Sequence, residues 1–121
     1  MRQRLTLPFP PSLNNCFVNA KGGGRIPSQR YKAWTTEALW SLKAQRAEKM
    51  TGDLSISIGL VAPDKRARDG DNLIKPALDI LVKAGIIADD SNKHVRRVSV
   101  EWLASGDPCV VIISRYMEEA A

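Results

Sequence analysis

The sequence has few of the residues that stabilise small secreted or metal-bound proteins. Cys16 and Cys109 are its only cysteines, and they lie too far apart to predict a disulfide framework or a CxxC metal site. No apolar run reaches the roughly 18 residues needed to span a bilayer. We therefore expect a cytoplasmic protein in a reducing compartment, neither secreted nor inserted in a membrane.

The glycine-rich stretch lacks the residues of a nucleotide-binding loop. Gly22, Gly23 and Gly24 are followed by Arg25 and not by the Lys-Ser or Lys-Thr of a Walker motif. Lys21 and Arg25 make the stretch basic, which suits either a flexible arm that contacts the DNA backbone or a solvated surface loop. The sequence leaves both interpretations open.

Positive charge exceeds negative charge along the chain. Lysine and arginine number 18 against 13 acidic residues in 121, so the formal net charge is +5. A small basic domain attracts polyanions, although many proteins are basic only for solubility. Nucleic acid is the leading class of partner, and the length predicts one domain spanning residues 1–121.

Hydrophobic periodicity and turn residues predict an α+β fold, with a mixed β-sheet and two main helices. The expected order is strand, helix, strand, helix, strand, strand. The predicted ranges are Arg2–Leu7, Ser28 to about Lys49, Leu54–Leu60, Asp71 to about Lys83, Val95–Leu103 and Cys109–Arg115. We expect residues 12–27 to form a loop and residues 118–121 a frayed tail.

Two aspartates and a lysine gather where the second helix should begin. Asp69 and Asp71 are separated by one residue, so their side chains point the same way in an extended segment. Asp71 can cap the helix, and Lys75 then lies one turn along the same face. Carboxylates of this kind hold Mg²⁺, which activates water and phosphate for phosphodiester hydrolysis.

The loop after the second helix offers a further acid, from the pair Asp89 and Asp90. Spacing alone does not establish that this loop returns to Asp69 and Asp71. A bland interpretation also stands, in which Asp71 only caps a helix and the preceding charges are solvated. In the functional interpretation, the basic residues before the acids carry the DNA backbone to the metal. These basic residues are Lys65, Arg66 and Arg68.

Three motifs, in this order and spacing, resemble the RusA-type Holliday junction resolvases, small endodeoxyribonucleases of bacteriophages and prophages. The first runs from Leu7 to Asn14, with the letters LPFPPSLN. The second is the basic run into Asp69–Leu73 with Lys75, and the third runs from Leu81 to Asp90. The resemblance covers nearly the whole chain.

The resemblance implies a homodimer that makes paired, symmetric nicks in four-way DNA junctions with Mg²⁺, or with Mn²⁺ in its place, during DNA recombination and repair. It assigns the catalytic and metal-binding acids to Asp69, Asp71 and Asp90, and the catalytic lysine to Lys75. Asp89 remains a candidate accessory ligand. Two rival functions share these features: a DNA-binding protein of the same fold that does not cut, and a nuclease for flaps or forks.

Two residues at the start of the second helix disturb the regular backbone that would carry this site. Gly70 makes the spacer between the two acids flexible. Pro76 removes a backbone hydrogen bond early in the second helix. The first turn of that helix is therefore expected to be distorted or 3₁₀-like, or the regular helix to begin at Pro76.

Overall fold

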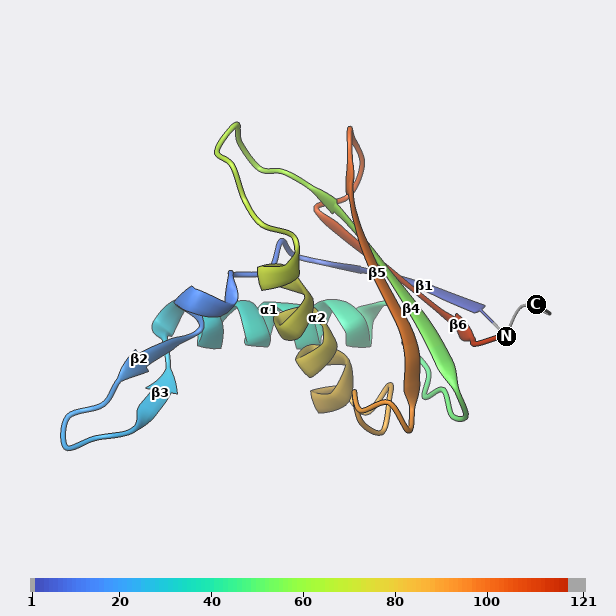
Figure 1. Cartoon of the computed structure of the whole chain (residues 1–121), viewed down its shortest axis with the longest axis horizontal. Coiled ribbons are helices and arrows are strands. Elements are labelled where there is room, and N and C mark those ends of the chain that lie inside the picture. Colours follow the sequence, from blue (N-terminus) through green and yellow to red (C-terminus); the bar gives the residue numbers. More distant parts are fainter. Residues whose placement is uncertain (1, 118–121) are drawn as a thin grey trace.

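A four-stranded mixed sheet forms the centre of the molecule (Figure 1). The computed structural model describes residues 2–117. The strand order is β1-β6-β4-β5, with β4 antiparallel to β6 and parallel to β5, and β6 antiparallel to β1. The strands are β1 (Arg2–Leu7), β4 (Leu54–Val61), β5 (Val95–Leu103) and β6 (Cys109–Arg115).

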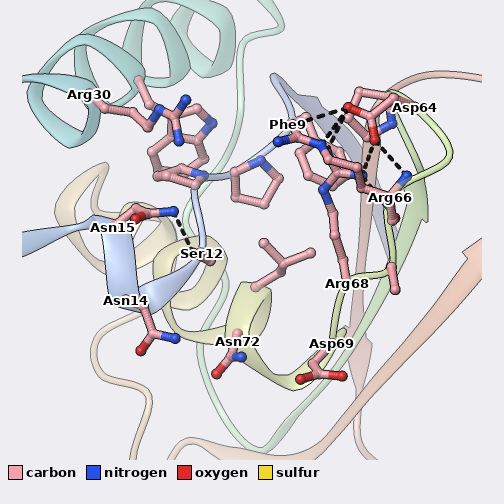
Figure 2. A pocket seen from close by; sticks show the side chains of 16 residues that line it. Phe9, Ser12, Asn14, Asn15, Arg30, Asp64, Arg66, Arg68, Asp69 and Asn72 are labelled. Atoms are coloured by element: carbon pink, nitrogen blue, oxygen red, sulfur yellow. Dashed lines mark hydrogen bonds and ion pairs between the residues drawn. The ribbon is translucent and has the colours of Figure 1, made fainter.

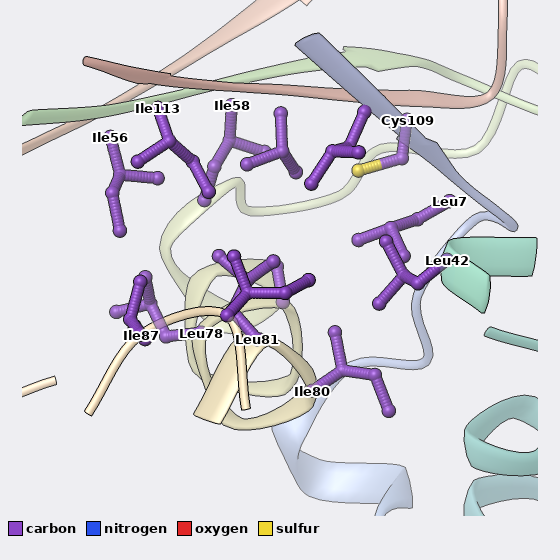
Figure 3. Packing of buried hydrophobic residues seen from close by; sticks show 14 of the residues in the cluster. Leu7, Leu42, Ile56, Ile58, Leu78, Ile80, Leu81, Ile87, Cys109 and Ile113 are labelled. Carbon is purple, nitrogen blue, oxygen red and sulfur yellow. The ribbon is translucent and has the colours of Figure 1, made fainter. Parts of the chain in front are cut away.

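Two helices, α1 (Gln29–Ala44) and α2 (Asp71–Lys83), lie on one side of this sheet (Figure 1). Ile56, Ile58 and Ile113 project from the sheet toward Leu81 of α2 and Leu42 of α1 (Figure 3). All five are buried, at 1 % exposure or less. This core fixes the sheet against both helices and so fixes the segments at the ends of α2.

Helix α1 begins as the sequence predicts but ends earlier. Ser28 caps it, because the Ser28 Oγ accepts a hydrogen bond from the Tyr31 amide at 3.1 Å. Trp34 and Leu42 are buried along its inner face, whereas Trp40 is 66 % exposed. The prediction that the helix reaches Lys49 is wrong, because Arg46 turns left-handed at φ 56° and ends the helical path.

Residues 12–27 are more regular than the predicted loop. They contain a 3₁₀ turn, η1 (Leu13–Asn15), and a hairpin of β2 (Phe17–Asn19) and β3 (Arg25–Pro27). Three glycines at positive φ turn the chain between the two strands. The hairpin projects away from the sheet like an arm (Figure 1). Single-sequence reasoning missed these strands because each has only three residues.

Helix α2 starts differently from the prediction. Gly70, and not Asp71, occupies the cap position in a helical conformation, and no side chain caps the helix. Asp71 is the first helical residue. The first turn is 3₁₀-like, because the Leu73 amide donates to the Gly70 carbonyl, three residues back, at 3.0 Å. The helix then continues through Pro76 to Lys83, so the alternative start at Pro76 is wrong. Gly85, at φ 75°, follows its end.

The observed α+β class, the mixed sheet and the two main helices confirm the predicted fold. The predicted element order holds once η1, β2 and β3 are added. Within the part of the chain that is described, neither helix is long and apolar enough to cross a membrane. The tail predicted at residues 118–121 lies outside the described residues.

Candidate active site and nucleic-acid groove

A groove of about 620 Å³ runs between the η1 turn and the loop from β4 to α2. One wall is formed by residues 9–12, 14 and 15, with Asn14 and Asn15 at the turn (Figure 2). The other wall is formed by the loop between β4 and α2 (residues 62–70, the basic loop), which includes Asp69, and by Asn72 in the first turn of α2. The groove therefore leads from cationic and amide side chains to one of the predicted catalytic acids.

Asp64 organises the basic wall of this groove. Its carboxylate accepts hydrogen bonds from Arg68 at 2.8 and 3.0 Å and from the Arg66 amide at 2.9 Å (Figure 2). The hydrogen bonds from Arg68 and Arg66 hold the pKa of Asp64 well below its usual range. The Arg68 guanidinium also lies 5.7 Å from the centre of the Phe9 ring. Arg68 is thus fixed in place, whereas the Arg66 side chain stays exposed although its guanidinium also lies 3.1 Å from the Asp64 Oδ2.

The structure brings Lys75 and Asp90 together. The Lys75 Nζ lies 2.8 Å from the Asp90 Oδ2 and 2.9 Å from the Asp79 Oδ1. Hydrogen bonds to Asp90, and then to Asp79, raise the pKa of Lys75 above its ordinary value. The loop after α2 therefore returns along the helix as far as Lys75, whereas the open question from sequence spacing was a return to Asp69 and Asp71. Lys75 is a cation shared between two carboxylates.

Asp69 and Asp71 occupy the loop end and the first helical position at the entry to α2. Both are exposed, and neither has an ion-pair partner among residues 2–117. Across that same stretch, no three histidine, cysteine, aspartate or glutamate side chains lie close enough together to hold a metal ion. Asp69 and Asp71 thus lie at the start of α2 and Asp90 in the loop after it, and the described chain does not gather these three predicted metal ligands into a cluster.

The accessory acid Asp89 is turned toward its own loop. Its Oδ1 accepts a hydrogen bond from the Asp90 amide at 2.8 Å, and this bond lowers the pKa of Asp89. That bond helps to set the turn from which Asp90 reaches Lys75. His94 is partly exposed and continues this loop into β5 through a hydrogen bond from the Leu54 amide to the His94 carbonyl at 2.8 Å.

The remaining predicted DNA contacts are exposed but separate. Lys65 lies at the tip of the basic loop, whereas Lys21 and Arg25 belong to the β2–β3 arm. The Arg25 guanidinium lies 5.3 Å from the centre of the Phe17 ring, which supports it from the neighbouring strand. The two basic regions are both accessible to a long polyanion.

Sequence reasoning missed two residues that matter for this geometry. Asp79 shares Lys75 with Asp90, and its position four residues after Lys75 was a usable signal for a helical ion pair. Asp64 neutralises part of the basic loop, and its position two and four residues before Arg66 and Arg68 gave a weaker signal. The sequence carried no sign that Arg30 of α1 would reach the groove.

Comparison with known proteins places this architecture in a class of DNA-cutting enzymes. The family model described as endodeoxyribonuclease RusA matches residues 8–114, which include the groove, both helices and most of the sheet. The chain therefore belongs to the RusA family of endodeoxyribonucleases.

Individual relatives agree with the family match, and each is named a crossover junction endodeoxyribonuclease RusA. The protein of Aquifex aeolicus (strain VF5) is 35 % identical over 86 residues, covering 70 % of this chain and 67 % of the relative. The protein of Shigella sonnei (strain Ss046) is 36 % identical over 89 residues, covering 72 % of each. The protein of Enterobacteria phage 82 is 33 % identical over 88 residues, again covering 72 % of each.

Proposed function

We propose that this chain is a Mg²⁺-dependent endodeoxyribonuclease that resolves four-way DNA junctions by paired, symmetric nicks as a homodimer. Its role would be in DNA recombination and repair, in the cytoplasm of a bacterial or phage-infected cell. The observation that carries the proposal is the 2.8 Å pair between Lys75 and Asp90. These two residues are 15 positions apart, and the family resemblance assigns both to the active site. Family membership and the names of the relatives support the same function.

The donor chemistry of the proposed site fits Mg²⁺. Asp69, Asp71 and Asp90 would supply hard carboxylate oxygens and leave positions for water and phosphate. Asp69 and Asp71 are exposed and have no ion-pair partner among the described residues, so they are accessible to a cation. When bound, the metal would polarise the phosphate and lower the pKa of the attacking water. Mn²⁺ has the same preference for oxygen ligands and should substitute.

The residues of the chain would act mainly by binding and by charge. Lys65 and Arg66 would bind the phosphodiester backbone along the basic wall of the groove. Arg68 would keep that wall in place through Asp64 and Phe9. Lys75 stays protonated because its pKa is raised, so its ammonium would stabilise negative charge that develops on the phosphate. Asp79 would keep Lys75 oriented when Asp90 turns to other ligands.

The decisive experiment compares substrates and one variant. Labelled four-way junction, linear duplex and flap DNA are incubated with the chain and Mg²⁺, and the same set is repeated with Asp71→Asn. We expect paired nicks in the junction, and we expect Asp71→Asn to abolish them without abolishing junction binding. Asp53→Asn is the matched control, because Asp53 pairs with Arg96 at 3.5 Å next to the start of β4, away from α2.

Each other outcome identifies a different function. Equal cutting of linear duplex would contradict junction resolution, and preferred cutting of flaps or forks would make the chain a nuclease for other branched DNA. Tight junction binding without product under Mg²⁺ or Mn²⁺ would identify a binding protein that does not cut. Undiminished cutting by Asp71→Asn would show that Asp71 does not belong to the active site.

A further inference from the structure

Asp79 holds the Lys75 ammonium from within the same helix. The Asp79 Oδ1 lies 2.9 Å from the Lys75 Nζ, and the Asp90 Oδ2 lies 2.8 Å from the same nitrogen. Lys75 and Asp79 are four residues apart on α2, so they lie on one face of the helix, whereas Asp90 belongs to the loop that follows it. One cation is thus shared between an acid of its own helix and an acid of a separate segment.

Helix stability is a poor explanation for Asp79. An acid stabilises a helix more when it stands four residues before a lysine than when it stands four residues after it, and here the order is the less favourable one. Aspartate is also among the weaker helix formers in a helix interior. The Asp79 side chain is 38 % exposed, so burial does not demand a partner for it. The contact is better explained by what Asp79 does for Lys75.

Lys75 and the proposed metal need the same carboxylate. The Asp90 Oδ2 accepts a hydrogen bond from the Lys75 ammonium, and Mg²⁺ binds through carboxylate oxygens of this kind. The lysine side chain is a flexible four-carbon stem, so an ammonium whose only partner was Asp90 would lose its position when that carboxylate turned away. Asp79 gives Lys75 a partner that does not depend on Asp90.

Asp79 itself lies outside the proposed metal site. It stands eight residues after Asp71 on α2, which separates the two residues by about 12 Å along the helix axis. At that spacing two short aspartate side chains cannot share one ion. The Asp79 carboxylate can therefore stay with Lys75 while Asp71 and Asp90 serve the metal.

We propose that Asp79 is a positioning residue for cleavage, which holds the Lys75 ammonium in place while the Asp90 carboxylate exchanges Lys75 for the metal. Asp79 contacts neither the metal nor the phosphate and acts only through Lys75. The inference rests on the proposed function for the metal and for the role of Lys75. It adds a residue that the family resemblance does not assign.

Asp79→Asn tests the inference, because it keeps the shape of the side chain and removes its charge. Junction affinity is measured without divalent metal, and the single-turnover rate constant is measured with Mg²⁺. We expect the rate constant to fall about tenfold, since a misplaced catalytic group costs rate, and the affinity to change by less than about threefold. Asp79→Glu restores the carboxylate and should recover most of the rate. Asp53→Asn is again the control and should change neither quantity.

A double variant separates positioning from support of the fold. Lys75→Ala removes the group through which Asp79 acts, so Asp79→Asn added to Lys75→Ala should slow cleavage no further. An acid that only supports the fold would slow cleavage by the same factor with and without Lys75.

Metal binding gives a readout that does not depend on cleavage. Mn²⁺ is titrated onto the chain without DNA, and electron paramagnetic resonance measures the ion that stays in solution. In Asp79→Asn, Lys75 keeps Asp90 as its only acid among residues 2–117, so the ion must displace a stronger pair. We expect Mn²⁺ affinity to fall about threefold. In the Lys75→Ala background the same change should matter by less than about 1.5-fold, because salt screens a charge at that distance.

Three results would overturn the inference and leave the nuclease function standing. They are an unchanged rate constant in Asp79→Asn, equal effects of Asp79→Asn on rate or Mn²⁺ affinity with and without Lys75, and a loss of junction affinity at an unchanged rate. The last would make Asp79 a DNA contact. A chain that neither binds Mn²⁺ nor cuts junctions would overturn the proposed function, and this inference with it.

Discussion

Individual carboxylates decide how much of the basic charge on this chain is free to meet DNA. Asp64 holds Arg68 at 2.8 Å, and the side chain of Arg68 is only 19 % exposed. Asp79 and Asp90 share Lys75. Lys65 has no ion-pair partner among the described residues. The cations near the groove therefore divide into those fixed by an acid and those available for phosphate.

Lys75→Ala removes the cation that links Asp79 to Asp90. We expect slower cleavage of bound junction with little change in junction affinity, because the ammonium acts on charge that develops during the reaction. The Lys75 side chain is half exposed, so the free energy of unfolding should fall by only about 0–1 kcal/mol. Single-turnover kinetics and binding titrations on the same DNA separate the two effects. A large loss of affinity with an unchanged rate constant would make Lys75 a DNA contact.

Burial of Cys109 makes stability depend on alkaline pH. Burial raises the pKa of this thiol to about 12, whereas in the unfolded chain it ionises near pH 8.5–9. A raised pKa favours the folded state below the unfolded pKa, and this contribution is lost as pH rises toward the folded pKa. Between pH 7 and pH 10 the free energy of unfolding should fall by roughly 1–2 kcal/mol through this group.

The test is urea unfolding of the chain and of Cys109→Ala at several pH values. The variant loses packing at every pH, since Cys109 is fully buried, but it should lack this part of the alkaline decline. Equal pH dependence in both proteins would contradict the assignment.

At the scale of helices and strands, local patterns predicted most of the fold. Alternation predicted β1 and β4, turn residues separated β5 from β6, and the Ser28 cap predicted the start of α1, because these signals depend on neighbouring residues. The β2–β3 arm escaped prediction because three-residue strands have no measurable period. The cap of α2 was wrongly assigned to Asp71, because glycine has no conformational preference from which the helical conformation of Gly70 could be predicted.

The candidate site was predicted only in part. Asp69, Asp71 and Lys75 could be placed near one helix start from spacing alone. The contact between Lys75 and Asp90 depends on how the loop after α2 folds back, which is a tertiary property. For the same reason, the ion pairs of Asp64 could be suspected from spacing but not assigned.

Ser28 links helix α1 to the base of the β2–β3 arm, and Ser28→Ala tests the strength of this link. Its Oγ caps α1 and also donates to the Asn15 carbonyl at 2.6 Å, which ties the base of the arm to the helix. We expect a loss of about 1 kcal/mol in the free energy of unfolding, as for other N-caps. Urea unfolding measures it, with Ser105→Ala in the exposed turn before β6 as the control. A change no larger than that of the control would show that the cap contributes nothing.

At the scale of the whole molecule, the net charge of +5 makes DNA binding sensitive to salt. Each phosphate contact that is lost should reduce the slope of log affinity against log salt by about 0.9. We expect this reduction for Lys65→Ala at the tip of the basic loop. Lys83→Ala is the control, because Lys83 lies in the last turn of α2, at the opposite end from Asp69. Titrations of junction DNA over a range of salt provide the slopes. Equal slopes for the two variants would show that the DNA does not contact Lys65.

The β2–β3 arm has a consequence for proteolysis. Residues 21–27 are exposed, and the chain at the tip is held mainly by the hydrogen bond from the Ala20 amide to the Gly24 carbonyl at 2.9 Å. Lys21 and Arg25 are sites at which trypsin cuts, and exposed loop tips are where proteases cut first. Trypsin should therefore nick the free chain in the arm before it reaches the sheet. If the arm lies along the DNA backbone, junction DNA should slow that first cut, and the digestion pattern would then record where the arm binds.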